Sequence, residues 1–555
     1  MDIRQLPALR VLILFIMCYL LLMHFSFVSS ILIFSIVCVF LIFRITTFKN
    51  SIVLFGIVLI CCVRIKYKPV YILPSNCYKI ERIVKENKEK TVFIGKGKEK
   101  VLFSLKIKAT QQNTYYPNDI VEYKARLNPL PLPKSLDGFV YADYLKKIGV
   151  DSVAYPIVFP KVLFRDTLSV VFLASKLRKS IVSYLLSFSK VTSSTKGFLI
   201  ALLTGDKSFL NKKEHQLFRE NGVVHVLAIS GLHVGILYFT LCFLLSKLFR
   251  LSGFFVFYTI AILLITYAFI TGLSPSVIRA VLMFILIHYG KLFHKSVSTL
   301  NIVFASAALM LFFNPDLMRD VGFQLSYSAV IGIVLIMQYS GFTDCFKTPY
   351  FNFFWKIILV NLAAFIFTAP VISFHFGIVN FTGIWASLVI VPLITIAMYL
   401  GIAILILSLN HFVAEKFFLS LDYLFFGLNK LLLLITESFN LSYHVFISGG
   451  ILVACFSILI FLVTKTKKWF VISLLICFLA PFFPLNNKIQ FLKVNSRIQL
   501  KFRNEIFYLK KGDSLFIENI EIFYQEKNKL SLQKLDYNKK IDFNVNNYQY
   551  LNLEF

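Results

Sequence analysis

The stretch Gly222–Leu237, GVVHVLAISGLHVGIL, lies near the middle of the chain and places polar residues in an apolar setting. It contains His225, Ser230 and His233, with glycines at positions 222, 231 and 235. Polar groups at bilayer depth are costly, about 2.5–3.5 kcal/mol for charged side chains on insertion scales, so they usually have a role. Glycine and serine at this depth allow close helix packing or a break in a helix. The stretch therefore predicts either a helix contact built from small residues or a functional site.

The composition of the whole chain is typical of a membrane protein. Of its 555 residues, 58% are hydrophobic and only 15% are charged. Apolar runs of about 18 residues or more recur along the chain, which indicates a polytopic α-helical membrane protein. The formal net charge of +30 indicates contact with an anionic partner such as nucleic acid or lipid headgroups, although a lysine-rich composition throughout would give the same excess. The nine cysteines include no CxxC pair, so a structural zinc site is not expected.

The first domain, residues 1–65, is expected to form transmembrane helices near 11–28, 29–43 and 51–63. Arg4, Arg10, Arg44 and Lys49 flank the first pair. By the positive-inside rule they place the N-terminus and the 44–50 loop in the cytoplasm. The third span would carry the chain outward, so we expect residues 66–165 to form an extracytoplasmic domain.

Short alternating runs in residues 66–165 predict β-strands: TVFIGKG at 91–97, KVLFSLKIKA at 100–109 and DIVEYKARL at 119–127. A helix is expected at 139–150. The pattern favours a small β-barrel of the oligonucleotide/oligosaccharide-binding (OB) type, a fold that holds single strands. This domain has 19 Lys and Arg against 9 Asp and Glu, so it is basic. Candidate DNA contacts are Lys96, Lys98, Lys100, Tyr115 and Tyr116, although most aromatic residues here would serve equally as strand core.

Residues 166–196 predict an interfacial amphipathic helix, because Lys176, Arg178 and Lys179 interrupt an apolar run. Residues 197–484 predict the main membrane domain. Its apolar segments lie near 197–205, 223–249, 253–271, 276–290, 299–313, 325–340, 354–376, 380–408, 413–440, 447–464 and 469–484. Pro370, Pro392 and Gly377 interrupt such runs, so broken helices are expected. Counting the N-terminal spans, we expect roughly 10–14 transmembrane or half-membrane helices. Residues 485–555 predict a short β-rich soluble tail.

Polar residues cluster at four places in the membrane domain. They are the 204–233 region, GLSPSVIRA at 272–280, the 314–330 region, and FTAPVISFHFG at 367–377. Arg279 is expected to pair with Asp320 or Asp206, because an unpaired charge in the membrane is expensive. Ser230 with His225 or His233 would suit a nucleophile and its base, which leaves an intramembrane hydrolase open. A site for a metal ion built from histidines is not expected, because spacing fixes no carboxylate or cysteine beside them.

Several motifs together resemble the ComEC competence family of inner-membrane DNA-uptake channels. They begin with ALLTGD at 201–206 and H-x-x-A-x-S-G-x-H at 225–233. GLSPSVIRA, DVGFQLSYSAVIGI at 320–333 and the FTAP…HFG run follow in the family's order. DGFVYADYLKKIGVDSVAY at 137–155 resembles the end of the family's external domain. The resemblance covers residues from about 50 to 480.

The resemblance implies passage of single-stranded DNA across the inner (cytoplasmic) membrane during natural transformation. It implies a functional core of eight residues, without individual roles: Asp206, His225, Ser230, Gly231, His233, Arg279, Asp320 and Gln324. Expected partners are single-stranded DNA, membrane lipids, a DNA receptor protein, a separate nuclease, a cytosolic ATP-driven translocase and further copies of the chain. The sequence contains no Walker A motif, so the pulling force is expected to come from a partner. No cofactor is expected.

The chain departs from the family pattern at its C-terminal end. Many members end in a metallo-β-lactamase-like domain that needs a histidine cluster for its metals. The last histidine here is His444, so we expect no nuclease activity in this chain, and a channel rather than an enzyme. The alternatives are an intramembrane hydrolase using Ser230 and His233, and a transporter of another anionic substrate.

Overall fold

The computed structural model describes residues 73–444 with short gaps at 75, 87–89, 107–113, 125–126, 131–144, 146–148, 157–158, 228, 294–297, 340–347 and 439–440. It also describes residues 455, 456, 458 and 459 and the backbone of the C-terminal strands between Lys488 and Glu554. The chain divides into two compact units, residues 1–70 with 167–478 and residues 71–166 with 479–555. The N-terminal helices expected within residues 1–65 lie outside the described residues, as do most of the 447–464 and 469–484 segments.

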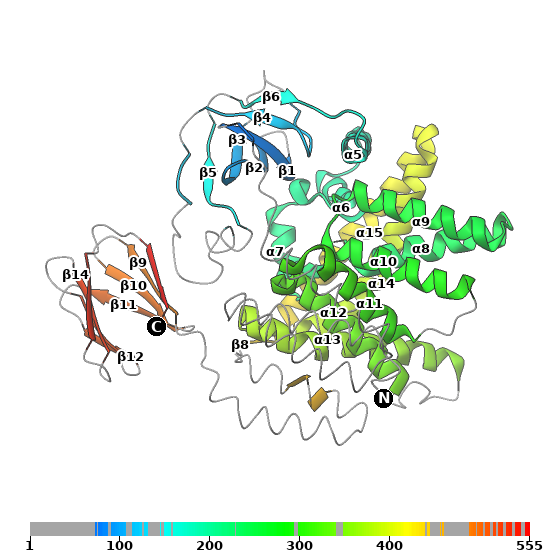
Figure 1. The fold of residues 1–555 in the computed structure, drawn as a ribbon. Coiled ribbons are helices and arrows are strands. Elements are labelled where there is room, and N and C mark those ends of the chain that lie inside the picture. Colours follow the sequence, from blue (N-terminus) through cyan, green and yellow to red (C-terminus); the bar gives the residue numbers. More distant parts are fainter. Residues whose placement is uncertain are drawn as a thin grey trace, which may run out of the picture. The chain divides into compact units, whose positions relative to one another are not determined.

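The first unit is helical, and most of its helices follow the apolar segments of the sequence (Figure 1). Their bounds are α5 Val170–Leu186, α6 Ser193–Thr204, α7 Lys212–Glu220, α8 Gly231–Phe243, α9 Gly253–Ile270, α10 Pro275–Leu292, α11 Thr299–Phe313, α12 Val321–Tyr339, α13 Pro349–Phe376, α14 Thr382–Ile406 and α15 His411–Ser438. A π-helical turn, Leu244–Leu248, extends α8. Short 3₁₀ turns lie at Lys207–Phe209, Val224–Leu227, Pro315–Arg319 and Leu407–Leu409.

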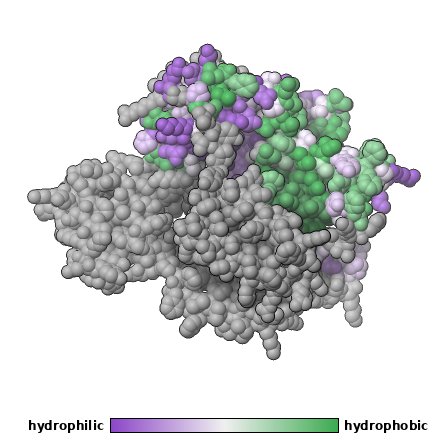
Figure 2. Space-filling view, viewed as in Figure 1, coloured by the Kyte–Doolittle hydropathy of each residue, from purple (hydrophilic) through white to green (hydrophobic). Residues whose placement is uncertain are grey.

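Seven of the described helices are long and apolar enough to cross a membrane. They are α8 with its π turn, α9, α10, α12, α13, α14 and α15, while α11 is apolar but shorter. Large hydrophobic side chains remain exposed on them, for example Phe243 on α8 and Phe255 and Ile262 on α9. Figure 2 shows hydrophobic residues gathered over the side of this unit where α8 and α9 lie. The protein is therefore a multi-pass membrane protein, as its composition predicted.

The sequence predicted helix breaks at two prolines and one glycine, and the structure shows a break only at the glycine. Pro370 and Pro392 lie inside the continuous helices α13 and α14, so the expected breaks at these two residues were wrong. Gly377 does end a helix: it follows Phe376 with a left-handed φ of 66°. Membrane helices tolerate an internal proline because neighbouring helices and local adjustments satisfy the freed backbone groups.

The described part of residues 73–166 forms a six-stranded sheet. The strands are β1 Cys77–Glu86, β2 Lys90–Lys96, β3 Lys100–Lys106, β4 Ile120–Glu122, β5 Ser152–Ala154 and β6 Lys161–Phe164. Their order is β5-β3-β2-β1-β4-β6; β3 and β5 run parallel and the other pairs antiparallel. The three strands expected from the sequence are thus confirmed as β2, β3 and β4. The expected helix at 139–150 lies mostly outside the described residues.

Alternation along β2 and β3 gives this sheet two apolar faces. Phe93 and Phe103 stack on one face, with ring centroids 4.9 Å apart, and Tyr115 packs against them. Val92 and Leu102 belong to a second cluster on the other side. Because successive side chains of a strand point to opposite faces, both faces can be covered by core residues.

The tail forms two antiparallel four-stranded sheets, which confirms its predicted β structure. One has the order β11-β10-β9-β16 and the other β12-β13-β14-β15. The strands are β9 Lys488–Val494, β10 Arg497–Phe502, β11 Glu505–Lys510, β12 Ser514–Ile517, β13 Ile520–Tyr524, β14 Lys529–Lys534, β15 Lys539–Asn544 and β16 Tyr550–Glu554. In the helical unit, β7 Ile378–Asn380 pairs with β8 Ser442–His444.

Candidate functional site

The motif stretch breaks just before α8. Gly222 has a left-handed φ of 69°, and a Cβ built on it would lie 3.1 Å from the Cα of Gly383. A short 3₁₀ turn follows at Val224–Leu227, and the helix begins only at Gly231. The single helix expected over 223–249 was therefore wrong in its first two turns. Glycine is needed at 222 because a side chain would be strained by the backbone and crowded by α14.

Ser230 is the N-cap of α8, and His233 is its partner. The Ser230 backbone N–H donates to His233 Nδ1 at 2.9 Å, and Ser230 Oγ lies 3.0 Å from the same nitrogen. This is the reciprocal half of a capping box, with histidine in the place that Glu or Gln usually takes. Because Nδ1 accepts a hydrogen bond, the neutral ring carries its proton on Nε2. The close Ser–His contact therefore has a structural explanation in helix capping.

His233 is fully buried, and its Nε2 has no hydrogen-bond partner among the described residues. His225 lies in the preceding 3₁₀ turn and is exposed. No hydrogen bond joins His225 to Ser230 or His233 in the described part of the chain. Gly231 begins α8 and faces Ala280 of α10, whose Cβ would be 3.9 Å from a Cβ at position 231. The structure thus brings Ser230 and His233 together and leaves His225 apart.

Asp206 ends the α6 region in a tight turn. Gly205 has a left-handed φ of 74°, and Asp206 accepts a hydrogen bond from the Ser208 backbone N–H at 2.9 Å. Its other oxygen lies 3.8 Å from a guanidinium nitrogen of Arg178 on α5. The expected partner of Asp206 was Arg279, and this was wrong. Asp206 instead links the end of α6 to Arg178 of α5.

Arg279, in the second turn of α10, is 3% exposed. Its guanidinium carbon lies 6.0 Å from the Phe323 ring centroid and 5.6 Å from that of Tyr327, both on α12. No described carboxylate lies within 4 Å of it, so the expected ion pair with Asp320 is also absent from the described residues. The rings of α12 occupy the place where the sequence suggested a carboxylate.

The other two polar clusters meet at α12. Asp320 caps this helix by accepting a hydrogen bond from the Phe323 backbone N–H at 2.7 Å. Gln324 donates to the Met318 carbonyl at 2.9 Å and accepts from His375 Nε2 of α13 at 2.7 Å. The 314–330 and 367–377 clusters are therefore joined directly. Among the described residues, no group of three or more His, Cys, Asp or Glu is suited to a metal ion.

A hydrogen bond also connects α10 to the stretch Gly222–Leu237. Ser276 Oγ donates to the Ile229 carbonyl at 2.8 Å. This bond satisfies a carbonyl in the non-helical segment before α8, where no intrahelical partner exists. The GLSPSVIRA block thus supports the position of Ser230.

A polar link that the sequence analysis missed lies on α15. Asp422 accepts hydrogen bonds from the hydroxyls of Thr192, at 2.6 Å, and Thr195, at 2.5 Å, at the start of α6. A carboxylate within the apolar segment 413–440 was a signal of such a partner. Its partners were not predictable, because they lie more than 200 residues away in the sequence.

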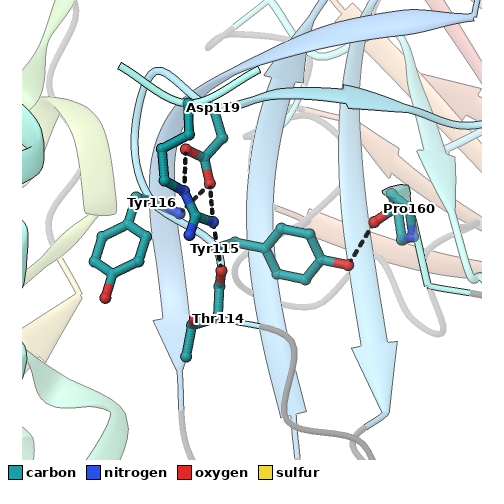
Figure 3. A network of polar contacts seen from close by, with 6 residues as sticks. Thr114, Tyr115, Tyr116, Asp119 and Pro160 are labelled. Carbon is teal, nitrogen blue, oxygen red and sulfur yellow. Dashed lines mark hydrogen bonds and ion pairs between the residues drawn. The ribbon is translucent and has the colours of Figure 1, made fainter. Parts of the chain in front are cut away.

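The six-stranded sheet holds the candidate DNA contacts of the second unit. Tyr115 is fully buried, and its hydroxyl donates to the Pro160 carbonyl at 2.9 Å (Figure 3). Its ring cannot stack on a base, so Tyr115 was wrong as a DNA contact. Lys100 forms an ion pair with Glu81 at 2.7 Å. Lys98 is exposed and Lys96 is half-buried.

Tyr116 belongs to a network around a buried carboxylate. Asp119, 1% exposed, accepts two hydrogen bonds from Arg165, at 3.0 and 2.8 Å, and one from the Tyr116 backbone N–H. The Arg165 guanidinium also donates to the Thr114 carbonyl and lies 4.8 Å from the Tyr116 ring centroid. The hydrogen bonds to Asp119 raise the pKa of Arg165, although burial opposes this. The network, seen in Figure 3, joins residues 46 positions apart, so the sequence did not reveal it.

Comparison with known proteins identifies the helical unit. Residues 202–469 match the family described as competence protein. ComE operon protein 3 of Bacillus subtilis is 30% identical over 258 residues, which are 46% of this chain and 32% of that protein. Recombination protein 2 of Haemophilus influenzae is 23% identical over 212 residues, 36% of this chain and 27% of that protein.

A further relative, an uncharacterized protein of Aquifex aeolicus, is 31% identical over 198 residues, 35% of this chain and 44% of its own length. The chain thus matches less than half the length of each of these relatives. No solved structure matches it. The family match contains the H-x-x-A-x-S-G-x-H motif and the three polar blocks that follow it, so residues 202–469 of this chain are similar to the competence protein family.

Proposed function

We propose that this protein conducts single-stranded DNA across the cytoplasmic membrane during natural transformation. The observation that carries the proposal is the family match over residues 202–469, because it contains all four polar clusters of the helical unit. Joined polar groups inside apolar helices, such as Gln324 with His375, suit a path for a charged polymer. The names of two relatives, a ComE operon protein and a recombination protein, agree with a role in DNA uptake.

The six-stranded sheet is proposed to meet the DNA first, as an OB-like extracytoplasmic domain. Its strand order, with β3 and β5 parallel, supports a partly closed barrel. Phosphate neutralisation dominates affinity for nucleic acid, and the excess of Lys and Arg in residues 66–165 provides it. Lys96, Lys98 and Tyr116 remain candidates for this contact. The N-terminus is proposed to be cytoplasmic.

The chain is proposed to act as a channel without enzymatic activity of its own. A DNA receptor, a separate nuclease and a cytosolic ATP-driven translocase are the partners expected for such a channel, and several copies could form the pore together. An intramembrane hydrolase is the alternative. The capping geometry of Ser230 and His233 favours the channel, since it explains their contact without a reaction.

The direct test is deletion of the gene in its host, followed by transformation with DNA carrying a selectable marker. We expect transformants to disappear and labelled DNA to stay outside the cell in a nuclease-sensitive form. Reintroducing the full chain should restore both. Normal uptake of DNA in the deletion strain would contradict the proposed function.

Substitutions at the α8 cap separate the channel from the hydrolase. Ser230→Ala keeps the Ser230 N–H to Nδ1 bond, so we expect transformation to stay near the wild-type level with about 1 kcal/mol of lost stability. A serine hydrolase would lose its activity. His233→Gln retains a side-chain acceptor and should be tolerated, whereas His233→Leu leaves the Ser230 N–H unpaired. The measurement is transformation frequency at matched protein abundance, and equal loss in Ser230→Ala and His233→Leu would contradict the capping role.

A further inference from the structure

The Arg279 side chain is a buried cation with no carboxylate within 4 Å among the described residues; the charge of Asp320 acts on it only from beyond that distance. It is 3% exposed, and its Nε and Nη1 atoms have no hydrogen-bond partner among the described residues. Arginine stays protonated in proteins and carries five N–H donors. An uncompensated buried charge costs several kcal/mol, so its retention inside the helices requires a compensating interaction.

The aromatic rings of α12 compensate only part of this cost. Phe323 and Tyr327 lie 6.0 and 5.6 Å from the guanidinium carbon, and such contacts contribute about 0.5–2 kcal/mol. The Tyr327 hydroxyl is already bound, 3.1 Å from Ser306 Oγ and 3.6 Å from the sulfur of Met310. The rings therefore stabilise the cation but leave N–H donors of the guanidinium without acceptors.

The nearby carboxylates have other roles. Asp320 caps α12 through the Phe323 N–H, and Asp206 lies beside Arg178. Neither lies within 4 Å of Arg279. Arg279 lies in the second turn of α10, which begins at Pro275, and over the ring of Phe323 in the first turn of α12, so both helix N-termini add positive dipole ends near it. The unsatisfied Nε and Nη1 groups are donors on a cation, so an acceptor with negative charge satisfies both the hydrogen bonds and the charge of Arg279.

We propose that Arg279 binds a phosphate oxygen of the single strand that this protein conducts. The inference rests on the proposed function and names the group that recognises the strand inside the membrane. The planar guanidinium matches phosphate geometry, and each phosphate of the strand presents the same acceptor oxygens. The contact forms when α10 and α12 separate enough to expose the guanidinium, and the rings of Phe323 and Tyr327 hold the cation until then.

The test measures binding of a fluorescent single-stranded oligonucleotide to the full chain in phosphatidylcholine nanodiscs over a range of salt concentrations. Arg279→Gln should weaken binding about tenfold, the effect of one charge-assisted hydrogen bond. It should also lower the slope of log affinity against log salt by about 0.7, the value for one phosphate contact on a single strand. A residue with a merely structural role would not change this slope.

Lys416→Gln is the matched control. Lys416 of α15 also lies over a ring, 5.3 Å from the Phe412 centroid, but it is exposed. Its replacement should leave affinity and slope unchanged. A second arm uses an oligonucleotide with uncharged methylphosphonate linkages, for which wild type and Arg279→Gln should bind equally weakly. If Arg279→Gln does not accumulate, Arg279→Lys is tested in its place. It should keep the slope of log affinity against log salt and bind the oligonucleotide more weakly.

The outcomes separate the inference from the proposed function. Wild-type protein that binds no single-stranded DNA contradicts the proposed function itself. If the wild-type protein binds DNA and Arg279→Gln has the same affinity for it, the phosphate contact alone is overturned. The same conclusion follows from Arg279→Lys where that variant is used instead. Repeating the titration in phosphatidylglycerol nanodiscs examines the lipid as a source of phosphate. Loss of bound phosphatidylglycerol in Arg279→Gln, with an unchanged DNA slope, would assign the site to a lipid headgroup and overturn the inference.

Discussion

Replacing Gly332 by alanine is expected to destabilise the helical unit by about 3 kcal/mol, the upper part of the range for overpacked cores. A Cβ at this position of α12 would lie 2.4 Å from Cγ and 2.6 Å from Cβ of Phe367 on α13. Phe367 is itself 1% exposed, and its Cβ is fixed to the backbone, so it cannot turn away. The two helices must therefore move apart. Thermal unfolding of the purified full chain in detergent measures the loss.

Gly427→Ala provides the control for this prediction. Gly427 lies within α15, another membrane-crossing candidate, and apart from the backbone of its own helix no described atom lies within 4 Å of a Cβ built there. Its replacement removes a flexible residue from a helix and should leave the melting temperature unchanged or slightly raised. In a Phe367→Leu background, Gly332→Ala should cost less than in the wild type, because the smaller side chain gives way. Equal melting of Gly332→Ala and Gly427→Ala would show that α12 and α13 are not in close contact at Gly332.

This contact shows what an apolar sequence reveals and what it conceals. The run of residues 325–340 was enough to predict a helix, since its length and composition suffice for a membrane span. α12 begins four residues earlier, at Val321, because Asp320 caps it. Nothing in the sequence indicated that Gly332 faces Phe367, because helix partners depend on packing between distant segments.

For the candidate site, too, the sequence predicted some contacts and not others. The H-x-x-A-x-S-G-x-H spacing indicated a contact of Ser230 with His225 or His233 and left the choice open, and the structure joins Ser230 to His233. The break before α8 was not foreseen, because it depends on the left-handed Gly222 and its neighbour Gly383 of α14. The expected ion pair of Arg279 failed for a related reason: electrostatics predicts that a buried cation has a partner, but only the fold decides that aromatic rings lie beside it.

In the sheet of the second unit, alternation identified the strands but could not distinguish core tyrosines from surface ones. Tyr115 and Tyr116 are adjacent, and either could have faced the core of the sheet. The deciding contact is the Tyr115 hydroxyl with Pro160, a residue 45 positions later. Sequence reasoning therefore assigned the two rings the same role, although only the Tyr116 ring has access to solvent.

Replacing Asp119 by alanine is expected to have the second large effect. The carboxylate accepts hydrogen bonds from Arg165 and the Tyr116 backbone, so its removal takes the counter-charge from a partly buried cation and these three hydrogen bonds from the network. Removing one partner of a buried pair costs about 3–5 kcal/mol, and the partial exposure of Arg165 places this case near 3 kcal/mol. Hydrogen exchange of the full chain should show about a hundredfold loss of protection in β4 and β6, which flank the network.

Lys124→Ala distinguishes this buried pair from an ordinary surface pair close by in the sequence. Lys124 follows β4 and pairs with Glu122 at 3.0 Å, but its side chain is 74% exposed, so its loss should change protection by less than about tenfold. Arg165→Lys keeps the charge and loses the bidentate geometry. Its loss of protection should therefore lie between that of Asp119→Ala and that of Lys124→Ala. If Asp119→Ala leaves the exchange of β4 and β6 as slow as Lys124→Ala does, the network does not hold the sheet edge. If a hundredfold loss of protection from exchange is confined to β4 and β6, Asp119 is the residue that stabilises the pairing of β6 with β4.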